Sequence, residues 1–302
     1  MTRAFVIGNP GAGRGRVGKE WTDLIAAIRT HGLDVQGRLT DAPGHAVDLA
    51  RQARADGVDL VVAAGGDGTV HEVVNGLLAD GTGTEIPELG VVPGGSGCDY
   101  AKTFGIPEDI AGAVSRLASE VPPRAVDVAE VRFQTEGGEV RRFFANISGV
   151  GIGAEVVQRA ARLPRALGGA VYFASFVLTL PGFERRRARI ELDDQIYEGP
   201  LTNLVVANAQ YFGGGMRVAP AADPGDGVFD VQIQFGSKLD YARGITKVYS
   251  GKHIPHPRIK EVRSSRLLVH CDPPALVEAD GEVLGRTPAA YSILSGAMRL
   301  KA

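Results

Sequence analysis

The first 120 residues alternate short apolar runs with segments in which apolar residues recur every three or four positions. Residues 4–7, 60–63 and 89–92 are short apolar runs and predict buried strands. Trp21, Leu24, Ile25 and Ile28 lie on one helical face, as do Ala46, Leu49, Ala50 and Ala53, and residues 70–79 continue as a third helix. This β–α alternation predicts a parallel sheet covered by helices.

The pattern changes after Pro122 and Pro123. Residues 126–133, 189–197 and 228–235 are rich in β-branched residues and predict strands, with turns at residues 136–138 and 193–194. Residues 163–180 and 239–249 are the expected helices of this half. We therefore predict an α/β domain over residues 1–123 and a mainly antiparallel domain over residues 124–302.

Composition and charge exclude several classes of protein. A chain of 302 residues with 44% hydrophobic residues can bury a large core. The 33 basic and 35 acidic side chains give a net charge of −2, which argues against nucleic acid as a partner. Cys98 and Cys271 fit neither a zinc spacing nor a disulfide framework, and no secretory pattern or apolar stretch of about 20 residues is present. These features predict a cytoplasmic protein without a transmembrane span.

Three glycine-rich loops follow the predicted strands of the first half. The loop at residues 8–15 fails the dinucleotide fingerprint because Arg16 stands at its last glycine position, and it fails the P-loop pattern because Glu20 replaces the magnesium-binding hydroxyl. The second loop contains Asp67 and the third, at residues 93–99, ends in Asp99. One such loop is usually a tight turn, but three after successive strands favour a phosphate site with a divalent cation.

Together these motifs resemble the diacylglycerol kinase catalytic-domain family, which includes bacterial lipid kinases and the sphingosine and ceramide kinases. The resemblance rests on residues 9–13, 65–76, 93–99 and 104–107, and on the later motifs at residues 208–216, 226–227 and 280–282. It implies an N-terminal ATP-binding domain and a C-terminal β-sandwich domain for the lipid substrate, with the last strand able to pack back on the first domain.

The resemblance also implies roles for individual residues. The nucleotide site would be lined by Asn9, Pro10, Gly11, Gly13, Thr40, Gly65, Gly66, Asp67, Gly68, Thr69, Glu72 and Ser96. Thr40 fits the first turn of a helix equally well.

The catalytic carboxylates are assigned from the motif of Asp280, Gly281 and Glu282. Glu282 matches the family's proposed proton acceptor, with Asp67 as the rival base. Asp67 and Asp99 are expected to position magnesium and phosphate, and Asp280 joins them as a catalytic candidate. A second, structural magnesium site is expected at Asp223, Asp226 and Val228, where a plain turn is the alternative.

The implied activity is transfer of the γ-phosphoryl group of ATP, with Mg²⁺, to a lipid hydroxyl at a membrane surface. Diacylglycerol, giving phosphatidic acid, is the expected acceptor; a sphingoid base, ceramide, NAD or another acceptor, or a non-catalytic nucleotide-binding regulator, are the alternatives. Cys98 stands where the family usually has asparagine, which bears on the choice of acceptor.

The apolar residues 170–180 are followed by Arg185, Arg186 and Arg187. This pattern fits either peripheral contact with a membrane or a buried helix followed by a solvated charge cluster. Whether the protein is a homodimer stays open.

Overall fold

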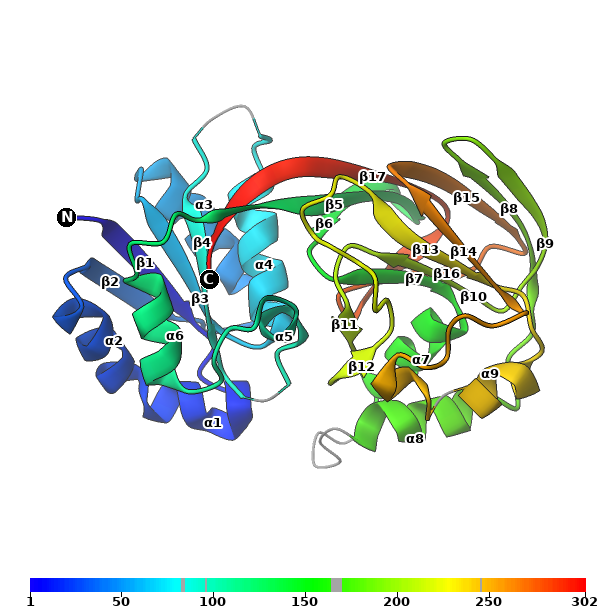
Figure 1. Ribbon diagram of the computed structural model, residues 1–302, viewed down its shortest axis with the longest axis horizontal. Coiled ribbons are helices and arrows are strands. Elements are labelled where there is room, and N and C mark those ends of the chain that lie inside the picture. The colour runs from blue at the N-terminus through cyan, green and yellow to red at the C-terminus, as the bar shows by residue number, and fades with distance from the viewer. Residues whose placement is uncertain (83–84, 96, 164–169, 245) are drawn as a thin grey trace. The chain divides into compact units, whose positions relative to one another are not determined.

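The computed structural model describes residues 1–82, 85–95, 97–163, 170–244 and 246–302 (Figure 1). The chain forms two compact units. The first contains Met1–Val128 and Ser295–Ala302, and the second contains Ala129–Leu294. Two strands, β5 (Arg124–Thr135) and β17 (Glu282–Lys301), contribute residues to both units.

The first unit is built on a parallel sheet in the order β17–β4–β3–β1–β2. Its strands are β1 (Arg3–Gly8), β2 (Asp34–Leu39), β3 (Leu60–Gly65) and β4 (Glu88–Pro93), with β17 joining β4 through Leu300 beside Leu89. Every residue of β3 is buried, which explains its unbroken apolar sequence.

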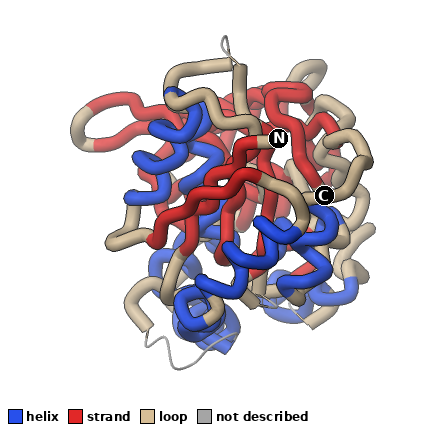
Figure 2. Tube along the Cα trace, turned by 90° about the vertical axis from the view of Figure 1, so that its left-hand side faces the viewer, coloured by secondary structure: helices blue, strands red, loops and turns tan. Residues whose placement is uncertain are grey.

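Helices lie on both sides of these strands (Figure 2). They are α1 (Ala12–Lys19), α2 (Trp21–Thr30), α3 (His45–Ala55), α4 (Asp67–Leu78), α5 (Asp99–Phe104) and α6 (Ile110–Leu117). Helices α3 and α4 pack on each other closely at Gly76, where a β-carbon would lie 2.3 Å from the Val47 carbonyl oxygen. A glycine is required at that contact.

The second unit is mainly antiparallel. Its ladders run β14–β13–β10–β7–β16–β17 on one path and β9–β8–β15–β17–β5–β6 on the other. These strands are β6 (Gly138–Phe144), β7 (Ile147–Gly151), β8 (Arg186–Leu192), β9 (Ile196–Leu201), β10 (Asn203–Ala207), β13 (Phe229–Gln234), β14 (Ile259–Ser264), β15 (Arg266–Asp272) and β16 (Leu276–Ala279). Their inward side chains form one core, in which the Phe144 ring lies 6.2 Å from the rings of Phe229 and Tyr291.

Shorter elements complete this unit. A small ladder joins β11 (Tyr211–Phe212) to β12 (Met216–Arg217), and a 3-10 turn spans Val248–Ser250. Helices α7 (Ile152–Ala160), α8 (Ala170–Thr179) and α9 (Lys238–Gly244) share a cluster that includes Ile152, Phe176 and Tyr241.

The predicted fold class is confirmed. The turn expected at residues 193–194 joins β8, which ends at Leu192, to the antiparallel β9, which begins at Ile196. One element prediction needs correction. The helix expected over residues 239–249 ends at Gly244, the residue type least suited to a helix interior apart from proline. Part of the helix expected over residues 163–180 lies outside the described residues. Among the helices that the structure describes, none combines the length and hydrophobicity needed to cross a bilayer.

Candidate functional site

The three glycine loops meet at the carboxyl ends of the neighbouring strands β1, β3 and β4. The Asn9 N–H donates to the Ala64 carbonyl at 3.0 Å, and the Gly94 N–H donates to the Gly65 carbonyl at 2.6 Å. A β-carbon at Gly13 would lie 1.7 Å from the Gly94 carbonyl oxygen, so the first and third loops touch through their main chains. This edge is where open α/β sheets bind ligands.

The first loop turns through three consecutive left-handed residues. Gly13, Arg14 and Gly15 have φ angles of 60°, 58° and 87°. Asn9 Oδ1 accepts the Gly11 N–H at 3.0 Å, and the Arg16 guanidinium donates to the Pro93 carbonyl at 2.7 Å. Arg16, which the sequence analysis used only to reject a fingerprint, therefore ties the first loop to the third.

The second loop leads directly into α4. Gly66 precedes the helix in an extended conformation, and β-carbons added at Gly66 or Gly68 would meet nothing within 4 Å. Open space in front of a helix N-terminus suits an anion such as phosphate. Gly65 is different, because a β-carbon there would lie 2.2 Å from the buried Thr69 hydroxyl.

Two carboxylates proposed for the nucleotide site hold main-chain groups. Asp67 accepts the N–H groups of Asp99 at 3.0 Å and Tyr100 at 2.9 Å, which fixes the start of α5. Glu72 accepts the N–H groups of Gly44 at 3.0 Å and Ala46 at 3.1 Å and so caps α3.

The remaining nucleotide candidates lie around these loops. Thr40 follows β2, and its N–H donates to the Gly8 carbonyl at 2.8 Å; Pro10 lies between Asn9 and Gly11 in the first loop. Asp99 is buried with Lys102 Nζ 3.5 Å from its carboxylate. Burial and the nearby Asp67 charge raise the pKa of Cys98, so its thiol stays protonated. Ser96 lies outside the described residues.

In the second unit, Asp280 and Glu282 have different environments. The Asp280 carboxylate is buried and accepts N–H groups from Ala145 at 2.9 Å, Asn146 at 3.0 Å and Ile147 at 3.2 Å. Asp280 also has a left-handed φ of 48°, as a tight turn requires. Glu282 begins β17 and is exposed.

The residues proposed for the structural magnesium form a closed turn. Asp226 Oδ1 accepts the Val228 N–H at 3.2 Å, and Oδ2 pairs with Arg263; the Asp223 carbonyl accepts the Gly225 N–H at 2.8 Å. No group of three His, Cys, Asp or Glu side chains suited to a metal occurs among the described residues. Arg263 thus supplies a positive charge beside Asp226. The magnesium site at Asp223, Asp226 and Val228 stays a prediction.

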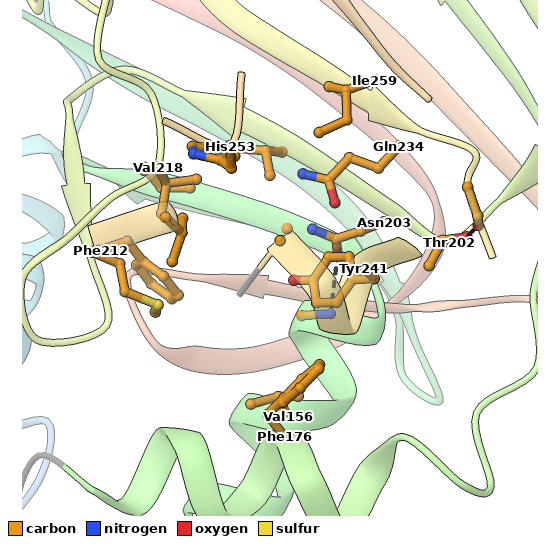
Figure 3. Close-up of a pocket in the computed structure, with 18 of the residues that line it drawn as sticks. Val156, Phe176, Thr202, Asn203, Phe212, Val218, Gln234, Tyr241, His253 and Ile259 are labelled. Atoms are coloured by element: carbon orange, nitrogen blue, oxygen red, sulfur yellow. Dashed lines mark hydrogen bonds between the residues drawn. The ribbon is translucent and has the colours of Figure 1, made fainter. Parts of the chain in front are cut away.

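The second unit contains an apolar cavity of about 140 Å³ (Figure 3). Val156, Phe176 and Val218 are among its apolar walls. Its buried polar side chains are Ser148, Thr202, Asn203, Gln234, His253 and Glu278. Burial raises the pKa of Glu278 well above its ordinary value, and the neighbouring Asp280 adds to the shift. Burial also raises the pKa of Tyr241 to about 12. The sequence analysis assigned none of the polar residues to a site, because Asn203, Gln234, Tyr241, Glu278 and His253 come from β10, β13, α9, β16 and a loop and share no spacing.

Comparison with known proteins identifies the family. The diacylglycerol kinase catalytic domain matches residues 3–131, and the YegS C-terminal NAD kinase beta sandwich-like domain matches residues 146–302. A diacylglycerol kinase of Bacillus subtilis (strain 168) is 31% identical over 294 residues, which cover 96% of this chain and 93% of that relative. The chain belongs to the diacylglycerol kinase family. It is therefore a phosphotransferase with an alcohol group as acceptor, as the sequence predicted.

Further relatives support the same assignment. A probable lipid kinase YegS-like protein of Chromohalobacter salexigens is 35% identical over 215 residues, 71% of this chain and 66% of that relative. A solved Bacillus anthracis protein, described as a candidate diacylglycerol kinase, superimposes with a TM-score of 0.78 at 25% identity, covering 99% of this chain and 96% of the other. Yeast NADH kinase shares the fold at a TM-score of 0.52 and 10% identity, over 99% of this chain and 82% of the other.

Proposed function

We propose that the protein is an ATP-dependent lipid kinase that phosphorylates diacylglycerol to phosphatidic acid. The observation that carries this proposal is the meeting of three glycine loops at one sheet edge, with open space before the α4 N-terminus. That geometry suits the phosphates of a nucleotide. The relatives named diacylglycerol kinase, one of which aligns over nearly the full length of both chains, support the acceptor.

The reaction is an in-line transfer. The acceptor hydroxyl oxygen attacks the γ-phosphorus of ATP, the bond from the γ-phosphorus to the bridging oxygen of the β-phosphate breaks, and ADP leaves with that oxygen. The hydroxyl proton passes to a carboxylate base. We assign this role to Glu282, because it is exposed, whereas both oxygens of Asp67 already accept main-chain N–H groups. Mg²⁺ is expected to arrive with ATP.

A membrane surface is the expected working place, since diacylglycerol is held in bilayers. The proposal thus includes peripheral membrane association of a protein located in the cytoplasm. The cytoplasmic location is proposed from the sequence features given above.

The test is incubation of the purified protein with γ-labelled ATP, Mg²⁺ and detergent-dispersed acceptors in parallel: diacylglycerol, a sphingoid base, ceramide and, without detergent, NAD. We expect label in phosphatidic acid. Label in another product alone would replace diacylglycerol as the acceptor, and ATP binding without label in any product would overturn the kinase proposal.

A further inference from the structure

One polar side chain in the cavity of the second unit has no protein partner. His253 is 8% exposed, and neither ring nitrogen has a hydrogen-bond partner among the residues that the structure describes. The Val218 carbonyl lies close enough to favour the protonated ring, which offsets part of the effect of burial on the pKa of His253. Figure 3 shows the ring beside Val218 at the cavity wall.

The ring is neutral in this environment. Burial lowers the pKa of His253, and the neighbouring His256 adds to the shift. A neutral imidazole carries one N–H donor and one acceptor nitrogen. Leaving both unpaired in an apolar surrounding costs free energy that a leucine of similar size would not cost.

The other polar groups of the cavity are engaged differently. Asn203 Oδ1 accepts the Gly153 N–H at 3.0 Å, Gln234 Nε2 donates to Gln232 Oε1 at 3.4 Å, and Glu278 accepts the Gly281 N–H at 3.2 Å. The Ser148 and Thr202 hydroxyls donate to the carbonyls of Glu278 and Gly236. Of these six buried side chains, His253 is the one whose polar atoms all lack a hydrogen-bond partner among the described residues.

The walls around His253 define the rest of the ligand. Val218 and Val248 belong to one buried cluster, and Phe212 and Met216 pack against it; all four line the cavity. On the opposite wall, Phe176 of α8 and Val156 of α7 continue the apolar surface. Phe173 and Tyr249 line the cavity and are also 52% and 48% exposed, so the cavity reaches the surface at these residues.

We propose that this cavity binds an acyl chain of the lipid acceptor and that a His253 ring N–H donates to the ester carbonyl of that chain. This inference rests on the proposed function. It narrows the acceptor class, because it predicts that the enzyme prefers glycerol esters to glycerol ethers. An ether-linked chain fills the same apolar walls but offers no carbonyl, and an ether oxygen is a weaker acceptor. His253 is thereby a specificity-determining residue.

The first test compares the KM for a diacylglycerol with that for the dialkyl ether of equal chain length, both in detergent micelles. His253→Leu is expected to raise the KM for the diester about tenfold, the value of one hydrogen bond. The KM values for the diether and for ATP should stay unchanged. His253→Gln, which keeps a donor, should restore part of the diester preference, and His270→Leu on the exposed face of β15 is the matched control. Equal effects on both acceptors, or no effect on either, would overturn the inference.

The second test does not depend on catalysis. Titration of the protein, labelled with ¹⁵N-histidine, with dioctanoylglycerol should move the ring resonances of His253 and leave those of His270 in place; the dioctyl ether should move them less. An unmoved His253 resonance in a protein that phosphorylates diacylglycerol would overturn this inference alone. A kinase assay without product, beside a clear His253 shift, would overturn the proposed function while the cavity assignment stands.

Discussion

At the scale of single residues, several acidic side chains of this protein hold the main chain. Asp67, Glu72 and Asp280 each accept two or three main-chain N–H groups from another segment. The motifs identified all three carboxylates in the sequence, but they did not identify the groups that donate to them. Gly44, Ala145 and Tyr100 donate through main-chain N–H groups, which every residue except proline carries, so no sequence pattern marks them. A carboxylate in such a motif therefore has a structural task whether or not it has a chemical one.

Glu282 is exposed at the start of β17, and its exposure suits a proton acceptor. Glu282→Gln is expected to lower kcat by roughly 100-fold or more, the range of general-base catalysis, while the Kd for ATP stays near that of the wild type. Steady-state kinetics and equilibrium ATP binding check this. Glu139→Gln, which changes an exposed carboxylate on β6, serves as the control. Near-normal turnover by Glu282→Gln would show that another group is the base.

The buried carboxyl group of Glu278 is expected to make the free energy of unfolding depend on pH. Burial raises its pKa in the folded protein, so the folded state binds this proton more tightly than the unfolded chain does. The stabilisation of the folded state by this bound proton is fully present below the unfolded pKa of about 4.3. It is lost as pH rises toward the folded pKa, at about 1.4 kcal/mol per pH unit. Glu278→Gln does not ionise, so its advantage over the wild type should grow from pH 5 to pH 7 in urea unfolding. Parallel pH profiles for the two proteins would contradict this.

At the scale of elements, the hydrophobic pattern predicts helices and strands best where one or both of their faces are fully buried. The runs of β1, β3 and β4 and the faces of α2 and α3 were visible as patterns, and the structure has these elements there. Strand β2 was missed because it lies at the sheet edge and three of its six residues, Gln36, Gly37 and Arg38, are consecutive and exposed. Its hydrogen bonds to β1, not its side chains, make it a strand.

Helix α8 is apolar on its exposed side as well as on its buried one. Ser175, Phe176 and Thr179 are buried, whereas Phe173, Val177 and Leu178 are 52%, 50% and 53% exposed. Lys238 of α9 donates to the Pro181 carbonyl just beyond α8, and Arg185 is exposed nearby in the chain. Apolar side chains beside basic ones favour the surface of an anionic bilayer.

Replacing Val177 and Leu178 with Ser is expected to weaken sedimentation with phosphatidylglycerol vesicles about tenfold or more, at about 0.8 kcal/mol for each methylene no longer buried in lipid. Ile196→Ser is the matched control, because Ile196 is 55% exposed but lies on β9. Equal vesicle binding by the two variants would show that α8 does not contact the membrane.

At the scale of the whole molecule, the first unit depends on the far end of the sequence. Leu300, fully buried, lies beside Leu89 of β4, and the Gly296 N–H donates to Asp127 at 2.7 Å. The family resemblance implied that the last strand can pack back on the first domain, but the hydrophobic pattern of residues 295–302 alone does not say against which sheet they pack. The cavity in the second unit could not be predicted for the same reason, since its walls come from segments more than 100 residues apart in the sequence.

Leu300→Ala is expected to destabilise the first unit by about 2–5 kcal/mol through lost burial and a cavity. Hydrogen exchange should then speed up in β3 and β4 more than in β15. Arg299→Ala, which removes an exposed ion pair with Glu88, should cost at most about 1 kcal/mol. Faster exchange confined to β15 would contradict the assignment of residues 295–302 to the first unit.

The return of residues 295–302 to the first unit also has a consequence for synthesis. A growing chain leaves the ribosome from its N-terminus, and domains usually fold in that order. Here residues 1–128 emerge first, but β4 gains its neighbour β17 only after the entire second unit has been translated. Until then one edge of the nascent parallel sheet is without its final strand, which makes it a natural surface for a chaperone to protect.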